Sequence, residues 1–227
     1  GVSAEMDSFY FANSVAVFIF GFVITGVSTV VIPCYVRKAN RRNTDAFLTA
    51  VFLGITSVSA LVLLLRTPLI SLITGREAEF VALSGDILIV LMVSNLFSIV
   101  TSVTAAYFQY AEKYNLPKMI ALFSQIMVVV FLAVFSEISV LQYAWIFGAG
   151  IVLNSVMDLL FALKSGWRYR PNLAVREPET RKLIHTFLPV LFSTGVYQLS
   201  LVIDSSIAAR LSTGDVTVLS YANQISS

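Results

Sequence analysis

The chain has 227 residues, of which 57% are hydrophobic and only 12% are charged, and its mean hydropathy is +0.84. Soluble domains carry roughly 25% charged residues, so this composition excludes a water-soluble globular protein and predicts a membrane protein. The formal charge of +2 is small and the basic residues are divided among separate connections, so no nucleic-acid partner is expected. The single cysteine, Cys34, excludes an internal disulfide, and with the single histidine, His185, it leaves no ligand set for a metal or other cofactor.

Apolar runs near the length that crosses a bilayer core, about 20 residues, alternate along the chain with short polar connections. They predict six transmembrane helices, over residues 9–32, 46–65, 80–110, 119–135, 142–163 and 183–209, and the start of a seventh at Val216. Pro189 is expected to kink the sixth helix. Lipid cannot satisfy an open sheet edge, and the segments lack the alternating pattern of a membrane barrel. The sequence therefore predicts an all-α, polytopic transmembrane helix bundle that forms a single membrane domain, 1–227.

The basic residues indicate an orientation, because lysines and arginines in short loops remain on the cytoplasmic side. Twelve of the 15 fall in the alternate connections 37–45, 111–118 and 164–182, whereas the opposite connections hold only Arg66, Arg76 and Arg210. This split predicts that the three basic connections are cytoplasmic and that residue 1 lies on the outer side. The longest of them, 164–182, is expected to be a solvated linker or an amphipathic segment on the membrane surface.

Polar side chains at membrane depth are candidates for a functional site, because each charge there costs about 2.5–3.5 kcal/mol to insert. The candidates for lining a substrate cavity are Asp7, Asn13, Asn154, Asp158, Gln198, Asp204 and Asn223, and the candidates for coupling to an ion gradient are Asp86 and Asp158. Asn154 and Asp158 are four residues apart and are expected to share one helical face, and Asp204 is a possible ion-pair partner of Arg210. The alternative is that these groups only hydrogen-bond between neighbouring helices.

Catalytic groups are scarce in the sequence. The only histidine lies near a basic connection, so no Ser/His/Asp arrangement can be assembled, and no aspartate-rich motif or glycine-rich phosphate loop is found. An enzyme is therefore not expected, and a membrane glycosyl- or phosphotransferase is the least favoured class of function.

Motifs at the two ends of the chain carry a family resemblance. They comprise GVSAEMDSF at 1–9, VIP at 31–33, FLPV at 187–190, QLS at 198–200, Asp204, GDV at 214–216 and LSYAN at 219–223. In order and spacing they resemble the second helix, the seventh helix and the entry to the eighth helix of the MurJ (MviN) family of lipid II flippases. This family lies within the superfamily of multidrug, oligosaccharidyl-lipid and polysaccharide exporters.

The resemblance implies a fragment that covers helices two to seven of about fourteen, most of the N-terminal lobe of an alternating-access transporter. It implies movement of a polyprenyl-pyrophosphate-linked saccharide, first of all the peptidoglycan precursor lipid II, across the bacterial inner membrane. The implied partners are this substrate, membrane lipids and cell-wall or polysaccharide assembly proteins. The resemblance carries the family's cavity charge over to Asp7.

The chain departs from the family pattern along its first helix. Lipid II flippases of the family carry a Pro-Asn pair, an arginine pair and a glutamate where this chain reads Ala16-Val17, Phe20-Gly21 and Thr25, and Gln224 replaces a basic residue. A divergent member is therefore expected. Two alternatives stay open, namely a flippase for another lipid-linked polysaccharide unit and a cation-coupled multidrug exporter.

Overall fold

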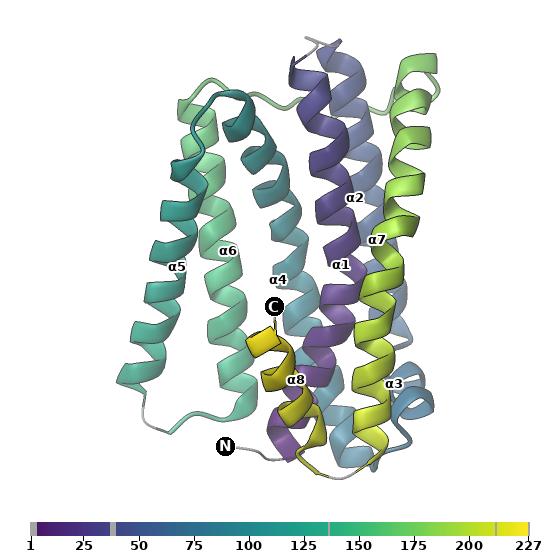
Figure 1. The fold of residues 1–227 in the computed structure, drawn as a ribbon, viewed down its shortest axis with the longest axis vertical. Helices are drawn as coiled ribbons and strands as arrows, with labels where there is room; N and C mark the ends of the chain where they lie inside the picture. The colour runs from purple at the N-terminus through teal and green to yellow at the C-terminus, as the bar shows by residue number, and fades with distance from the viewer. Residues whose placement is uncertain (1–3, 37–39, 136, 212, 227) are drawn as a thin grey trace.

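The structure, a computed structural model, describes residues 4–36, 40–135, 137–211 and 213–226, and these residues form eight α-helices (Figure 1). The helices are α1 (Ala4–Val36), α2 (Arg41–Leu64), α3 (Arg66–Thr74), α4 (Ala78–Tyr110), α5 (Asn115–Val134), α6 (Val140–Lys164), α7 (Pro178–Arg210) and α8 (Asp215–Ser226). Six of them, all except α3 and α8, are long and apolar enough to cross a membrane. The predicted all-α class and the six predicted spans are thus confirmed.

The long helices run side by side, with α4 between a pair formed by α5 and α6 and a group formed by α1, α2 and α7 (Figure 1). Helix α1 packs along both α4 and α7, and α6 packs between α4 and α5. The core lies mainly between α1 and α4, where Phe11, Phe20, Ile87 and Leu91 are almost completely buried. By contrast, most side chains of α5 are exposed, as expected for a helix whose outer face contacts lipid.

The connections separate into two ends of the bundle (Figure 1). One, here called the basic end, holds the starts of α2, α5 and α7, and the described basic residues Arg41, Arg42, Lys113 and Arg170 lie there. The other, the α3 end, holds α3, the start of α1 and the connection from α7 to α8. The predicted grouping of the connections is therefore found in the fold, although Gly1, Arg37 and Lys38 lie outside the described residues.

Local sequence accounts for several helix boundaries. Helix α6 begins with a capping box in which Ser139 and Gln142 satisfy each other's backbone N–H groups. Helix α3 ends at Gly75, whose φ of 61° is the left-handed conformation that glycine adopts without strain. The prolines at 33 and 189 lie inside α1 and α7, so neither ends its helix, and α1 continues past the boundary that Pro33 predicted.

Two glycines allow α6 to pack closely on both of its neighbours. A methyl group at Gly148 would overlap Ser94 of α4, and one at Gly150 would overlap Val128 of α5. Small residues of this kind let membrane helices approach each other without a solvent-driven hydrophobic force. The close packing determines which side of α6 faces α4. This side of α6 carries Asn154, Ser155 and Asp158.

Candidate functional site

A cluster of polar side chains joins α4 and α6 within the membrane-spanning region. Asp158 of α6 is fully buried and accepts a hydrogen bond of 3.2 Å from the amide of Asn154. The same amide lies 3.4 Å from the hydroxyl of Thr101 on α4, and that hydroxyl is 2.8 Å from the hydroxyl of Ser155. The prediction that Asn154 and Asp158 share one helical face is therefore confirmed.

Two oxygens of this cluster have no hydrogen-bond donor among the described residues. They are Oδ1 of Asp158 and Oδ1 of Asn154, and both are buried, although the hydroxyl of Thr101 also interacts with the Asp158 carboxylate. Buried polar atoms in native proteins are nearly always paired, so an unpaired one calls for a functional explanation or an additional ligand. Unpaired carboxylate and amide oxygens beside two hydroxyls are suited to a proton or to a small hard cation. No group of three or more His, Cys, Asp or Glu side chains able to hold a metal occurs in the described part of the chain.

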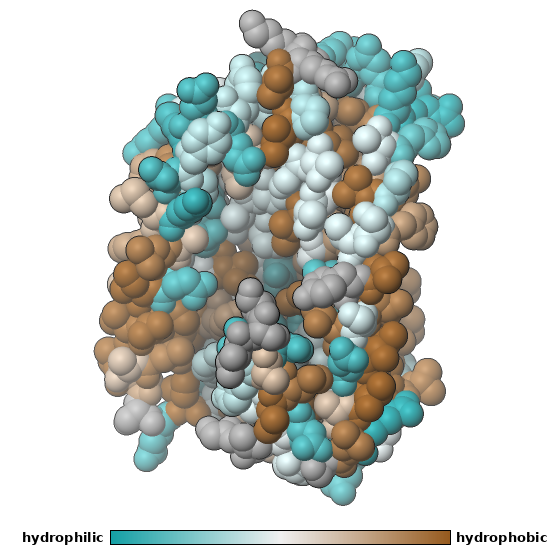
Figure 2. All heavy atoms as spheres, in the orientation of Figure 1, coloured by the Kyte–Doolittle hydropathy of each residue, from teal (hydrophilic) through white to brown (hydrophobic). Residues whose placement is uncertain are grey.

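Hydroxyl groups continue this polarity from α4 to α1. The hydroxyls of Ser28 and Ser102 are 3.0 Å apart, and Ser102 also donates to the carbonyl of Ile24 at 2.7 Å. Thr25 and Thr29 are exposed on α1, and each hydroxyl donates to a carbonyl of its own helix. Figure 2 shows a pale, weakly hydrophilic area over the upper half of α1 and a hollow between α6 and α1 with hydrophilic atoms inside it.

Gln198 brings a polar group from α7 toward the same helix. Its side chain covers Gly21 of α1, so that a Cβ at this glycine would lie 2.9 Å from the amide nitrogen of Gln198. The amide oxygen of Gln198 is buried and has no donor among the described residues. Gly21 therefore makes room for an amide between α1 and α7.

Asp7 has a different environment from the other candidates. Its carboxylate is fully buried and accepts hydrogen bonds from the backbone N–H of Gly214 at 2.5 Å, from the backbone N–H of Thr217 at 3.0 Å and from the hydroxyl of Thr217 at 2.7 Å. These donors surround the first turn of α8, where a negative charge is favoured by both the free N–H groups and the helix dipole. Asp7 thus caps α8 and attaches it to α1, and in this conformation its carboxylate faces that helix terminus.

At the α3 end of the bundle, two arginines connect the C-terminus of α7 with the C-terminus of α3 and the residues after it. Arg210 of α7 donates to the carbonyls of Ile73 at 2.8 Å and Leu72 at 3.2 Å, the last turn of α3, while Nε of Arg76 donates to the carbonyl of Ala209 at the end of α7. The expected pairing of Arg210 with Asp204 is therefore wrong, because Arg210 instead binds carbonyls that the end of a helix leaves free.

The remaining candidates lie apart from the α4–α6 cluster. Asp86 lines a pocket of about 400 Å³ at the α3 end together with Arg66 and Arg76, whereas Asp158 lies in the half of the bundle nearer the basic end. Asn13 is half-buried on α1, Asp204 is exposed on α7, and Asn223 is exposed on α8. The structure therefore brings Asn154 and Asp158 together and leaves the two ion-coupling candidates in opposite halves of the bundle.

Comparisons with known proteins point to one family. A family model described as lipid II flippase MurJ matches residues 1–227. The probable lipid II flippase MurJ of Vibrio cholerae serotype O1 is 31% identical over 80 residues, which are 34% of this chain and 15% of that protein. The lipid II flippase MurJ of Burkholderia cenocepacia is 31% identical over 100 residues, which are 42% of this chain and 19% of that protein.

A solved structure agrees with the sequence matches in fold. It is a lipid II flippase MurJ in an inward closed conformation, and it matches 99% of this chain with a TM-score of 0.75 and 20% sequence identity. The chain corresponds to 49% of that structure, and the aligned segments cover less than a fifth of the two curated relatives. The fold is thus shared along nearly the whole chain, while its matches span at most about half of each relative.

Proposed function

Since the chain belongs to the MurJ family of lipid II flippases, whose model it matches over residues 1–227, we propose that the protein moves a polyprenyl-pyrophosphate-linked saccharide, first of all lipid II, across the membrane. The family and the six apolar helices indicate a multi-pass protein of the bacterial inner membrane. The family match is the observation that carries the proposal. Alternating access between helical lobes is the mode of transport that we propose for it.

The hollow between α6 and α1, which has hydrophilic atoms inside it, supports this function (Figure 2). A saccharide and a pyrophosphate need hydrogen-bonding groups at membrane depth, whereas their prenyl chain needs an open side toward lipid. Hydroxyls on α1 and the amide of Gln198 on α7 supply such groups without a full charge in the bilayer. We assign Asn13, Asn154, Gln198, Asp204 and Asn223 to the walls of the transport path as its candidate substrate-binding residues.

The orientation in the membrane follows from the positive-inside rule. In this proposal the basic end faces the cytoplasm, where the lipid-linked precursor is loaded, and the α3 end faces the outer side. The connections 37–45, 111–118 and 164–182 are then cytoplasmic. Asp7, Arg76 and Arg210 hold helix termini together at the outer side.

The Asn154–Asp158 pair is the coupling site that the geometry favours. An unpaired carboxylate oxygen next to an unpaired amide oxygen favours uptake of a proton or of Na⁺, since either would remove the cost of leaving these atoms without a partner. Asp86 is the second coupling candidate, and it lines a separate pocket at the α3 end together with Arg66 and Arg76. Movement of the substrate needs no covalent step, so we propose a transporter without enzymatic activity. Its proposed partners are cell-wall or polysaccharide assembly proteins.

A flippase for a different polyprenyl-linked saccharide is the second candidate function. Helix α1 contains no lysine or arginine from Ala4 to Val36, and Phe20-Gly21 and Thr25 stand where lipid II flippases of the family carry arginines and a glutamate. Cations for the pyrophosphate would then come from other helices. The missing charges on α1 would change which head group the protein recognises. They would not change its proposed class, a flippase for a polyprenyl-linked saccharide.

Complementation tests the proposed substrate. The full-length protein is expressed in a bacterium depleted of its own lipid II flippase, and growth and peptidoglycan synthesis are measured. Rescue is expected for the parent protein and equally for the variant Glu5→Ala, because Glu5 is exposed on α1. Failure to rescue, with the protein present in the membrane, would contradict lipid II as the substrate and favour another polyprenyl-linked unit.

A further inference from the structure

The connection between α6 and α7, residues 165–177, is a strap that crosses the basic end (Figure 1). Its central side chains alternate in character, with Trp167, Tyr169 and Pro171 lining an apolar pocket and with Arg170 and Asn172 lining a basic one. Alternation of this kind places successive side chains on opposite sides of an extended segment. The strap therefore separates an apolar compartment from a basic compartment.

Hydrogen bonds hold the strap against the start of α2. The hydroxyl of Tyr169 is 2.7 Å from that of Thr49, and the backbone N–H groups of Arg170 and Asn172 donate to Asp45 and to Thr49, each at 3.2 Å. The amide of Asn172 also donates to the carbonyl of Arg42 at 2.7 Å. These bonds fix the two compartments next to each other, one on each side of the strap.

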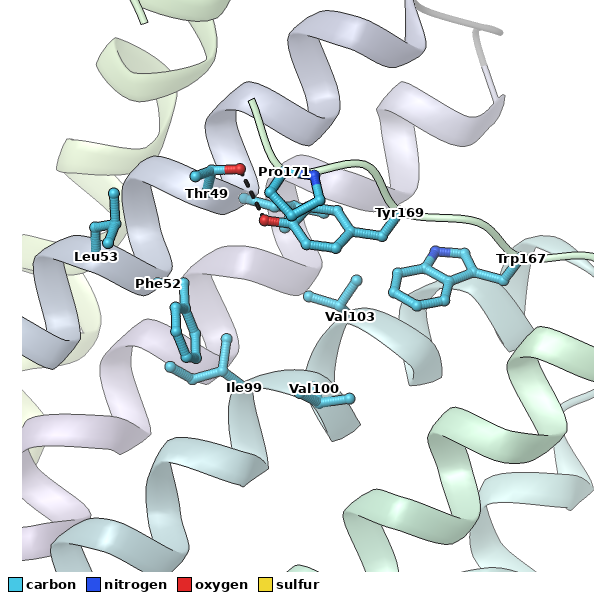
Figure 3. Close-up of a pocket in the computed structure, with 10 residues that line it drawn as sticks. Thr49, Phe52, Leu53, Ile99, Val100, Val103, Trp167, Tyr169 and Pro171 are labelled. Carbon is cyan, nitrogen blue, oxygen red and sulfur yellow. Dashed lines mark hydrogen bonds between the residues drawn. The ribbon is translucent and has the colours of Figure 1, made fainter. Parts of the chain in front are cut away.

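The apolar compartment is a pocket of about 410 Å³ between α2, α4 and the strap (Figure 3). Phe52 and Leu53 of α2 and Ile99 and Val103 of α4 form its walls, and the rings of Trp167 and Tyr169 lie at one side of it. Phe52 and Leu53 remain 42% and 49% exposed, so the pocket is open at the surface of the bundle. An apolar hollow that opens into a bilayer is directly accessible to acyl chains.

The basic compartment is a pocket of about 560 Å³, lined by Arg41, Arg42, Asp45, Arg170 and Asn172. Three arginines face one carboxylate here. Arg41 lies 3.8 Å from Asp45, and Arg42 pairs with Glu177 at 3.2 Å, while both arginine side chains stay more than half exposed. Arginine binds phosphate oxygens in a bidentate way, so the lining favours an anionic group.

Aromatic residues place the boundary between the two compartments at the level of the membrane interface. The indole N–H of Trp167 donates to the hydroxyl of Tyr35 at 2.9 Å, the rings of Trp167 and Tyr169 are stacked, and the hydroxyl of Tyr107 donates to the carbonyl of Ser165. Tyrosine and tryptophan gather where head groups meet the hydrocarbon core. A lipid in the adjacent leaflet would thus have its phosphate near the arginines and its chains beside Phe52.

We propose that the strap and α2 form a binding site for an anionic glycerophospholipid of the leaflet at the basic end. Its phosphate is held by Arg41, Arg170 and Asn172, and one acyl chain fills the pocket between α2 and α4. Basic pockets between helices on the cytoplasmic side are a recognised mode of anionic-lipid binding. The site depends on the chain spanning a membrane and not on which saccharide it transports.

Trp167 provides a direct probe, because it lines the pocket and is 9% exposed, whereas the other tryptophan of the chain, Trp145, is 61% exposed on α6. The full-length protein is reconstituted in nanodiscs of phosphatidylcholine that contain a fixed fraction of either brominated phosphatidylglycerol or brominated phosphatidylcholine. Bromine on the acyl chains quenches tryptophan fluorescence at contact. The difference in fluorescence between the parent and the Trp167→Phe variant is the signal of Trp167 and reports on the pocket. The difference between the parent and Trp145→Phe is the signal of Trp145 and reports on bulk lipid.

The expected result is that phosphatidylglycerol quenches the Trp167 signal more strongly than phosphatidylcholine does, while the Trp145 signal responds equally to both. Arg170→Gln should reduce the preference roughly fivefold, the effect of one basic residue near an anionic surface. The matched control Arg176→Gln changes another arginine of the strap, one outside both compartments, and should retain the preference.

Three results would overturn the proposal. They are equal quenching of Trp167 by both lipids, absence of quenching by either, and reversal of phosphatidylglycerol quenching by an equimolar amount of a polyprenyl phosphate. The last result would assign the pocket to the chain of the transported lipid. Because complementation does not depend on these measurements, failure of the lipid site and failure of the proposed function can be told apart.

Discussion

Asp7 and Asp158 are both completely buried carboxylates on apolar helices, yet their surroundings are opposite. Three donors from Gly214 and Thr217 surround the carboxylate of Asp7. Asp158 receives one bond from Asn154 at 3.2 Å and interacts with the hydroxyl of Thr101, but its Oδ1 has no donor within hydrogen-bond geometry among the described residues. Burial alone therefore does not identify a functional carboxylate.

The difference concerns how much hydrogen-bonding capacity each carboxylate has left. A carboxylate whose oxygens are saturated by backbone N–H groups stabilises the fold and has little capacity left for a ligand. A carboxylate with an unpaired oxygen remains available to a proton, a cation or a substrate group. In this conformation Asp7 accordingly caps α8 at the α3 end, and Asp158 is the residue that we propose for the transport machinery.

The largest expected effect is on stability, in the variant Asp7→Ala. The change leaves two backbone N–H groups and one hydroxyl buried without an acceptor, at a cost of about 1–3 kcal/mol each. We expect the free energy of unfolding to fall by about 3 kcal/mol or more, as measured by denaturant titration of the purified protein in detergent. Glu5→Ala, at an exposed position of the same helix, is the control and should unfold as the parent does. An Asp7→Ala protein of parental stability that fails to transport would contradict the capping role.

The second effect concerns transport, in Asp158→Asn. The amide has nearly the shape of the carboxylate but can neither release a proton nor neutralise a cation, so the initial rate of lipid flipping should fall at least about tenfold, equivalent to about 1.4 kcal/mol of coupling. The free energy of unfolding should change by less than about 1 kcal/mol. Glu5→Gln is the matched control, because it also converts a carboxylate to an amide and Glu5 is exposed at the start of α1. A normal ion-dependent rate in Asp158→Asn would remove it from the coupling site.

A smaller effect is expected in Thr101→Val, which keeps the shape of the side chain and removes the hydroxyl that contacts Ser155 and Asn154. An interhelical hydrogen bond in a membrane contributes about 0.6 kcal/mol, so a rate decrease of about threefold is expected in the same flipping assay. Thr104→Val is the control, since that hydroxyl donates only to carbonyls of its own helix. Equal rates for the two variants would show that the α4–α6 contact does not contribute to transport.

The smallest expected quantity is the coupling between Asp204 and Arg210. Because Arg210 donates to carbonyls of α3, Arg210→Gln should lower the free energy of unfolding by about 1 kcal/mol, and Asp204→Ala should add to it independently. A double-mutant cycle should therefore give a coupling energy within about 0.5 kcal/mol of zero. A coupling clearly above that value would restore the ion pair expected from the sequence.

Periodicity and composition were sufficient to predict the spanning helices but not the short one. Each long apolar run became a helix, whereas α3 has nine residues, too few to give a reliable periodic signal. Pro33 predicted the end of the first span, yet α1 continues to Val36. Prolines within membrane helices are tolerated where the surroundings compensate for the freed backbone group.

The candidate site was predictable only where its partners are close in sequence. The Asn154–Asp158 pair follows from a spacing of four residues, but the donors to Asp7 lie 207 and 210 residues away and no local pattern identifies them. Thr101, Ser102 and Ser155 were missed because single hydroxyl residues in apolar runs are common and can bond to their own helix. The pockets on either side of the strap depend on long-range packing, although the alternation of residues 167–172 was a usable signal.

The most direct measurement is flipping of lipid II by the purified full-length protein in liposomes, followed as loss of access of an externally added head-group reagent. Protein-dependent movement, abolished or strongly reduced in Asp158→Asn and retained in Glu5→Gln, is the predicted result. Liposomes that contain folded protein and yet move lipid II no faster than protein-free liposomes, with and without an ion gradient, would contradict the assignment of this substrate.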